Sequence, residues 1–137
     1  MGARYGMSFA KKHIEEGDFD EAIRVTTDEI DAGTANPELF FDRATALDLL
    51  ERHEDAAADF ERAIALDQAD RQLTIEDVDD AYFSALASSA EKTMRASPDK
   101  ALATLARYAV CLPEGRHTAD VADWNKRVRG ELKSPTK

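Results

Sequence analysis

Residues 17–23 read Gly-Asp-Phe-Asp-Glu-Ala-Ile, and residues 51–57 read Glu-Arg-His-Glu-Asp-Ala-Ala, followed at 59–67 by Asp-Phe-Glu-Arg-Ala-Ile-Ala-Leu-Asp. The small residues Ala22 and Ala56 hold the same place in the two stretches and lie 34 positions apart (56 − 22 = 34). A helix-turn-helix unit that recurs at this period cannot bury its apolar face alone, so successive units stack on one another. The two stretches therefore predict an all-α fold of stacked helix pairs.

Capping and stop signals outline the first two helix pairs. Asp18 followed by Glu21 has the spacing of a capping box. Asn36 before Pro37 supplies an N-cap and then a proline in the first helical turn. With Gly33 as a stop signal, we expect helices over about 3–15, 18–32, 37–50 and 53–67.

The third unit is expected to depart from the repeat period. Thr74 predicts an N-cap, and apolar residues then recur at helical spacing from Val78 to Met94. Ser97 and Pro98 open the next helix, in which Ala101 lies 45 positions after Ala56 (101 − 56 = 45), 11 more than the period (45 − 34 = 11). We therefore expect a divergent repeat with an elongated first helix, whose apolar stripe is Val78, Tyr82, Leu86, Ala90 and Met94.

After a loop that contains proline and glycine, Thr118 is expected to cap a last helix over 118–132. Val121, Trp124, Val128 and Leu132 share one face of this helix, which would cover the apolar side of the third unit. The chain is then a single domain over 1–133, with repeats at about 3–36, 37–70 and 74–113, the capping helix at 118–132 and a disordered tail at 134–137.

Residues 39–67 closely resemble a tetratricopeptide (TPR) repeat, and residues 5–36 resemble one more loosely. In the first unit Gly6, Thr26 and Glu29 stand where the family has an aromatic, an aromatic and a small residue. The resemblance implies a TPR-like α-solenoid of about three antiparallel helix pairs plus a C-terminal capping helix. Six positions of the second unit carry it, by alternating bulky and small residues at helix crossings: Phe40, Ala44, Leu47, Ala56, Phe60 and Ala63.

The resemblance implies a function in protein binding, because in this family the first helix of each pair lines a concave groove. We expect this groove to hold a peptide or helix that carries apolar anchors and some basic residues. Phe41 is either an exposed aromatic anchor or packed on a neighbouring helix, and Asp42 and Asp48 are expected to select a basic or neutral ligand. The predicted groove residues are Met7, Lys11, Ile14, Phe41, Asp42, Thr45, Asp48, Leu49, Phe83 and Leu86.

One TPR class binds the carboxylate end of chaperone tails through Lys, Asn and Arg side chains. Of the matching positions in this chain only Lys11 is cationic, and Asp42 would repel a carboxylate. The residues therefore argue against that specific function. The matching positions are Met7, Lys11, Asp42, Phe83 and Ala87.

Composition fits a soluble folded domain, with 137 residues, 43% hydrophobic and 34% charged. The net charge is −10, and residues 114–137 carry six Lys or Arg against four Asp or Glu (+2), which leaves −12 for residues 1–113. Such an acidic body argues against nucleic-acid binding, which depends on neutralising phosphates. No apolar run is long enough to insert in a membrane, and without a signal-like start we expect a cytoplasmic protein.

No residue pattern points to catalysis, a metal or a cofactor. The histidines His13, His53 and His117 are not spaced as a site, and the Glu-x-x-His spacing of Glu114 and His117 is interrupted by glycine and preceded by proline. Cys111 cannot form an internal disulfide and lies between apolar residues, as a packing residue would. We therefore predict that the protein is not an enzyme.

Three non-catalytic roles follow from the resemblance. The preferred one is an adaptor or assembly subunit with a protein or peptide partner. A dedicated chaperone for a secreted client is an alternative, because small acidic proteins with three TPR-like repeats include the translocator chaperones of bacterial type III secretion. A structural subunit that forms a homo-oligomer through its own repeats is the other.

Overall fold

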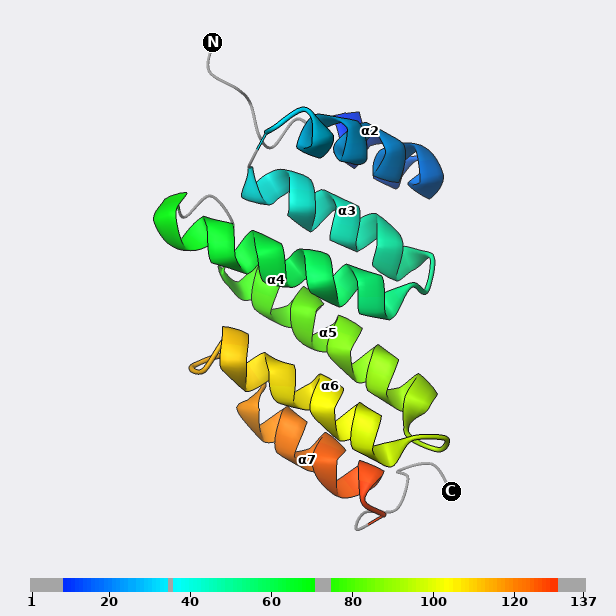
Figure 1. Cartoon of the computed structure of the whole chain (residues 1–137), viewed down its shortest axis with the longest axis vertical. Coiled ribbons are helices and arrows are strands. Elements are labelled where there is room, and N and C mark those ends of the chain that lie inside the picture. Colours follow the sequence, from blue (N-terminus) through cyan, green and yellow to red (C-terminus); the bar gives the residue numbers. More distant parts are fainter. Residues whose placement is uncertain (1–8, 35, 71–74, 131–137) are drawn as a thin grey trace. The chain divides into compact units, whose positions relative to one another are not determined.

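The computed structural model describes residues 9–34, 36–70 and 75–130, and within these ranges the chain forms seven α-helices and no strand (Figure 1). Its contacts divide it into two compact units, Met1–Val78 and Asp79–Lys137, and each unit is described by itself. Among the described helices, none combines the length and the apolar character that crossing a bilayer requires.

Unit 1 contains four helices, and consecutive ones pack on each other. Figure 1 shows α2, α3 and α4 side by side, and α1 also contacts α3. The start expected for the first helix lies outside the described residues, whereas the other three helices begin and end within a few residues of the predicted bounds. The helices are α1 (Phe9–Glu15), α2 (Phe19–Asp31), α3 (Pro37–Leu49) and α4 (His53–Asp70).

The two turns that join paired helices in unit 1 have the same backbone conformation. Helices α1 and α3 end 34 positions apart (49 − 15 = 34), and α2 and α4 begin 34 positions apart (53 − 19 = 34). Each turn contains one residue in the left-handed region, Gly17 with φ 81° and Glu51 with φ 64°. The sequence period is therefore also a period of the structure.

The backbone hydrogen bonds of these turns also recur at 34 positions. In each turn one N–H reaches back five residues and the preceding N–H reaches back three, which is the Schellman pattern at a helix C-terminus. This pattern satisfies carbonyl groups that would otherwise lack partners at the helix end. The bonds are Asp18 N to His13 O (2.8 Å) and Gly17 N to Ile14 O (3.0 Å) in the first turn, and Arg52 N to Leu47 O (2.9 Å) and Glu51 N to Asp48 O (2.9 Å) in the second.

Fully buried alanines lie at equivalent positions of the two pairs. Ala10 and Ala44 are 34 positions apart, as are Ala22 and Ala56, and all four have 0% exposure. Because alanine has only a Cβ, it lets two helix backbones approach closely. Ala22, Ala44 and Ala56, which the sequence pattern singled out, therefore lie in the core of unit 1.

One departure from the repeat pattern is accommodated within the core. Thr26 stands where the second unit has Phe60, and it is also completely buried. Its hydroxyl donates to the carbonyl oxygens of Ala22 (2.8 Å) and Ile23 (3.0 Å). The smaller side chain thus fits without leaving a buried polar group unpaired.

The expected caps are confirmed only in part. The Asn36 side chain accepts a hydrogen bond from the Glu38 N–H at 2.9 Å, as an N-cap should. The capping box at Asp18 is wrong, because the Asp18 side chain makes no cap hydrogen bond. The Glu21 carboxylate binds the Arg24 guanidinium through both oxygens (2.5 and 3.1 Å) rather than turning back to the helix start.

Unit 2 holds most of α5 (Ile75–Thr93), with α6 (Pro98–Cys111) and α7 (Thr118–Val128). The elongated helix is confirmed, since α5 has 19 residues and α3 has 13. The connection from α5 to α6 spans residues 94–97, where no residue has positive φ, so this described turn differs from the two in unit 1. The expected N-cap at Thr74 lies outside the described residues.

Helix α7 covers the third helix pair, as expected. Its Val121, Trp124 and Val128 pack against a buried cluster made by Ala90, Ala101 and Leu105. The predicted N-cap at Thr118 is wrong by one position: His117 is the N-cap, and the Thr118 hydroxyl donates to the Gly115 carbonyl at 3.2 Å. Leu132 and the tail at 134–137 lie outside the described residues.

Replacing Gly17 by Ala should reduce the free energy of unfolding by about 1 kcal/mol, because an L-residue is strained in the left-handed region. An added Cβ at Gly17 meets nothing within 4 Å, so the expected loss comes from the backbone alone. Gly17→Asn is the matched control, since asparagine tolerates this conformation and should lose much less. Urea denaturation compares the two variants, and equal stability of Gly17→Ala and the parent would contradict the turn described.

Candidate functional site

The predicted groove residues fall in both units. Those on α1 and α3 come together in unit 1, because these two helices contact each other. Phe83 and Leu86 lie on the part of α5 that belongs to unit 2. Met7 lies outside the described residues. The members in unit 1 are Lys11, Ile14, Phe41, Asp42, Thr45, Asp48 and Leu49.

Lys11 and Asp42 form an ion pair between α1 and α3, with Lys11 Nζ 2.8 Å from Asp42 Oδ1. Asp42 has 1% exposure, so the expectation that its carboxylate faces a ligand in the groove is wrong. The physical reason is that a buried carboxylate needs a cationic partner, and Lys11 supplies it from the facing helix. Burial alone would lower the pKa of Lys11, but the hydrogen bond and charge of Asp42 outweigh it and raise that pKa.

A second carboxylate, Glu38, joins this pair. Its Oε1 lies 3.7 Å from Lys11 Nζ. Burial, and to a smaller extent the nearby charge of Asp42, raise the pKa of Glu38, although Lys11 opposes the shift. Lys11 is therefore a cation shared between two carboxylates inside unit 1.

Phe41 packs on the neighbouring helix α4. Its ring meets that of Phe60 edge to face, with centroids 5.6 Å apart and an interplanar angle of 63°. Lys11 Nζ lies 5.7 Å from the Phe41 ring centroid. Phe41 was expected either to be an exposed anchor or to pack on a neighbouring helix, and these contacts describe packing. Part of the residue remains exposed.

The other α1 and α3 residues differ in how accessible they are. Ile14 packs against a buried cluster made by Ala10, Ala22 and Ala46. The Thr45 hydroxyl donates to the Phe41 carbonyl at 2.9 Å. Asp48 Oδ1 lies 2.5 Å from His53 Nδ1, so this carboxylate also has an internal partner. Leu49 is 52% exposed and is the open apolar residue of the set.

In unit 2 Leu86 is completely buried, so its predicted role as a groove contact is wrong. It belongs to the apolar stripe of α5, and a residue on the buried face of a helix cannot also meet a ligand. Phe83 is partly buried and stacks on the His117 ring, with centroids 4.4 Å apart and planes 3° apart. It also contacts the Tyr108 ring edge to face at 5.9 Å.

His117 fastens the start of α7 to the start of α5. Its Nε2 lies 2.8 Å from Asp80 Oδ1, and its Nδ1 lies 2.8 Å from Asp120 Oδ2. Only a doubly protonated imidazole can donate from both nitrogens. Burial alone would lower the pKa of His117, but the bonds to Asp80 and Asp120, with the charge of Asp79, raise it above its ordinary value.

The buried Tyr108 hydroxyl joins the loop before α7 to α5 and α6. Tyr108 donates from its hydroxyl to Asp79 Oδ1 and accepts from the His117 backbone N–H at 2.9 Å. Asp79 also accepts from the Arg116 N–H at 2.8 Å. Burial, and then Asp79, raise the pKa of Tyr108 to about 12. Gly115 is required here, because a Cβ would lie 2.0 Å from the Tyr108 hydroxyl oxygen.

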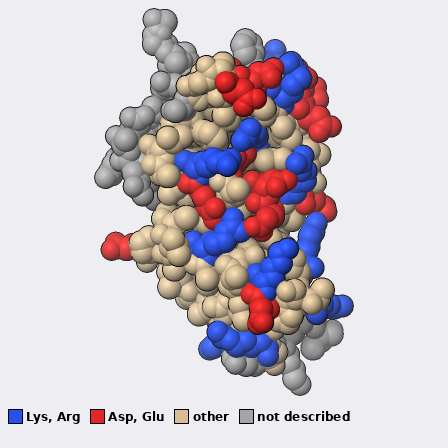
Figure 2. All heavy atoms as spheres, viewed as in Figure 1, with Lys and Arg blue, Asp and Glu red and all other residues tan. Residues whose placement is uncertain are grey.

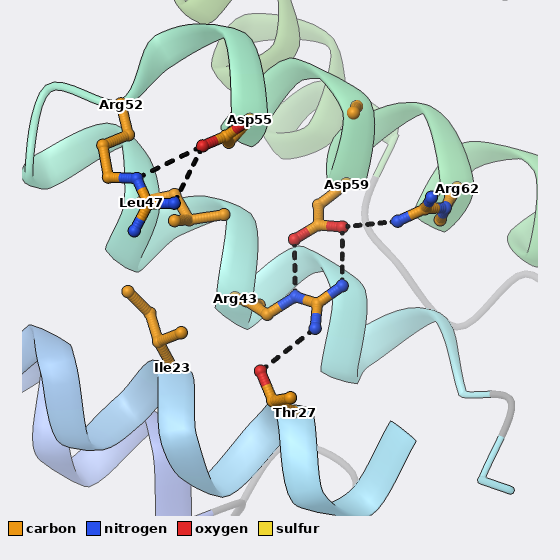
Figure 3. A pocket seen from close by; sticks show the side chains of 9 residues that line it. Ile23, Thr27, Arg43, Leu47, Arg52, Asp55, Asp59 and Arg62 are labelled. Carbon is orange, nitrogen blue, oxygen red and sulfur yellow. Dashed lines mark hydrogen bonds and ion pairs between the residues drawn. The ribbon is translucent and has the colours of Figure 1, made fainter. Parts of the chain in front are cut away.

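A depression of about 390 Å³ opens between α2, α3 and α4 in unit 1 (Figure 3). On the face shown in Figure 2, side chains of both signs are interleaved over these helices. At the floor of the depression Arg43 donates to both oxygens of Asp59, at 2.7 and 3.0 Å, and to the Thr27 hydroxyl at 3.1 Å. The lining residues are Ile23, Thr27, Arg43, Leu47, Arg52, Asp55, Ala58, Asp59 and Arg62.

Sequence reasoning did not find this depression. Arg43 and Asp59 are 16 positions apart, so no local pattern joins them. The usable signal was the spacing of apolar residues on α2 and α3, which places Ile23 and Leu47 on facing helices but does not show that a space remains between them.

Among the residues that the structure describes, no group of three or more His, Cys, Asp or Glu side chains is arranged to hold a metal ion. Comparison with known proteins gives no further assignment, since no protein-family model, no curated protein and no solved structure matches the chain.

The Lys11 pair predicts an asymmetric response to mutation. Lys11→Met leaves the carboxylate of Asp42 buried without this partner. It should lower the free energy of unfolding by roughly 2 kcal/mol, which lies between the losses typical of breaking exposed and fully buried ion pairs. Asp42→Asn leaves the ammonium of Lys11, whose side chain is 33% exposed, and should cost less. Urea denaturation at pH 7 compares the two variants, and a greater loss for Asp42→Asn would contradict the described burial.

The His117 contacts predict that unit 2 weakens as the pH rises. Because the folded pKa of His117 is raised, its stabilisation is complete below its ordinary pKa of about 6.5 and is lost as the pH rises through the folded value. The single Trp124 lies on α7, so its fluorescence during urea unfolding at pH 6 and pH 8 reports this loss. The free energy of unfolding of the parent minus that of the His117→Gln variant isolates the contribution of His117. A difference that does not change with pH would contradict the doubly paired ring.

Proposed function

We propose that this protein is a non-catalytic interaction module of TPR-like helix pairs that serves as an adaptor or assembly subunit. The observation that supports the proposal best is the recurrence of the helix hairpin at 34 positions, in helix ends, left-handed turn residues and backbone hydrogen bonds. Units repeated in this way bury a core between neighbours and present a continuous outer surface, which is how helical repeats bind partners.

The contact surface of unit 1 differs from the one expected. The groove carboxylates Asp42 and Asp48 are engaged with Lys11 and His53, so they provide no strong reason for a basic partner. Leu49 on α3 is an exposed apolar residue, and the α2–α3–α4 depression is a hollow on the surface of this unit. We propose that a partner polypeptide engages unit 1 through these two features.

Site-specific photocross-linking in the native cell tests the proposal. A cross-linking amino acid replaces Leu49, Arg52 at the rim of the depression, or Lys100 as an exposed control on α6 of unit 2. The proposal predicts that Leu49 and Arg52 each capture a recurrent set of other proteins and that Lys100 does not. Capture of this chain alone would replace the adaptor by a self-associating subunit, and a single secreted client would indicate a dedicated chaperone. Equal capture from all three positions would reject a specific surface on unit 1.

A further inference from the structure

The α2–α3–α4 depression has a local charge opposite to that of the whole chain. Its lining contains three arginines and two aspartates, a sum of +1, whereas the chain carries −10. At about 0.1 M salt, exposed charges more than roughly 10 Å apart are largely screened, so the local charges dominate recognition at short range. Asp31 acts on the Arg43 guanidinium from outside this lining and offsets the small net charge. The attraction for an anionic group therefore comes from the arginine N–H donors that line the depression.

The floor of the depression is held rigidly. The Arg43 side chain is 16% exposed, and the Asp59 side chain that it binds is 4% exposed. The bidentate bond to Asp59 and the bond to Thr27 fix the guanidinium plane, and Figure 3 shows these contacts among the side chains that line the depression. A guanidinium held in this way offers its remaining N–H groups in fixed directions.

The rim supplies donors that internal contacts do not exhaust. A guanidinium has five N–H donors. Within the described part of the chain, Arg62 donates to Asp59 alone, and Arg52 donates to Asp55 through Nε and Nη2. The Arg52 and Arg62 side chains are 56% and 60% exposed. The Arg62 guanidinium lies 6.0 Å from the centroid of the core Phe40 ring, so it would meet an incoming carboxylate from this position rather than by turning away.

An apolar wall lies beside these charges. The half-buried Ile23 of α2 lines the space beside the buried Leu47 of α3 (Figure 3), and Ala58 adds a small residue from α4. An aliphatic side chain of a ligand could pack here while a neighbouring carboxylate reaches the arginines. The depression therefore combines two chemically distinct contacts at adjacent places.

We propose that the depression binds an aspartate or glutamate side chain that stands next to an aliphatic residue in a partner segment. This inference rests on the proposed function, and it names the chemistry of the partner. Arginine is suited to the role because its planar group binds carboxylates through paired hydrogen bonds. Asp55 competes for Arg52, so one such motif binds weakly, on the order of millimolar, and the partner gains further affinity from neighbouring contacts.

Two peptides test the proposal by NMR titration of the arginine Nε–Hε signals. The probe is acetyl-Ala-Leu-Glu-Ala-amide, and its control is acetyl-Ala-Leu-Gln-Ala-amide, which lacks only the charge. The glutamate peptide should shift the signals of Arg52 and Arg62 and bind about tenfold more tightly than the glutamine peptide. Equal binding of both peptides, or shifts confined to residues outside the depression, would overturn the proposal.

Matched variants locate the binding. Arg52→Gln combined with Arg62→Gln should weaken the glutamate peptide about tenfold, since both exposed rim donors are removed. Arg24→Gln is the control, because Arg24 is an exposed arginine of α2 that pairs with Glu21 and Asp28 outside the depression. Circular dichroism checks that each variant keeps its helices. If the peptides bind equally while Leu49 still cross-links other proteins, this inference fails and the proposed function stands.

Discussion

The close approach of helix backbones at completely buried alanines is the constraint on which unit 1 depends. Ala10, Ala22, Ala44 and Ala56 are completely buried, and each carries only a methyl group, so these positions permit the helices to pack closely. This approach fixes how α2, α3 and α4 lie against one another (Figure 1). Only with that arrangement can Arg43 of α3 reach Asp59 of α4 and Thr27 of α2 together. The candidate binding surface is thus a consequence of the core.

Several charged residues serve as internal ties in this acidic chain. Lys11 joins α1 to α3 through Asp42, and Arg43 joins α3 to α4 through Asp59. Within unit 2, the loop before α7 is held to α5 by His117 and by Arg116, whose Nη2 lies 2.6 Å from Asp80 Oδ1. Asp42 and Asp59 are the buried members of these pairs, and taking a carboxylate out of water costs free energy that its cationic partner offsets. Arg116 and Asp80 are more than half exposed, so the bond between them contributes less.

The sequence predicted what depends on neighbouring residues and missed what depends on distant ones. The Asn36 cap and the apolar stripe of α7 each act within one helix, and the 34-residue spacing repeats short local patterns, so helix order, the second-repeat packing and the cover provided by α7 were accessible. Asp42 is bound 31 positions away at Lys11, and His117 is bound 37 positions away at Asp80, so their roles required the fold. Leu86 shows a different limit of prediction from sequence. It was predicted both on the buried apolar stripe and in the groove, and one side chain cannot lie in both places.

The central claim is that the two helix pairs of unit 1 are equivalent close-packed units, and stability measurements on Ala22→Leu and Ala56→Leu test it most directly. Both positions are completely buried and 34 residues apart (56 − 22 = 34), whereas Ala65, on the same helix as Ala56, is exposed and supplies the Ala65→Leu control. Overpacking should cost each buried variant about 1 to 3 kcal/mol of unfolding free energy in urea denaturation. The control should change by no more than about 0.5 kcal/mol. Buried variants as stable as the parent would contradict the claim.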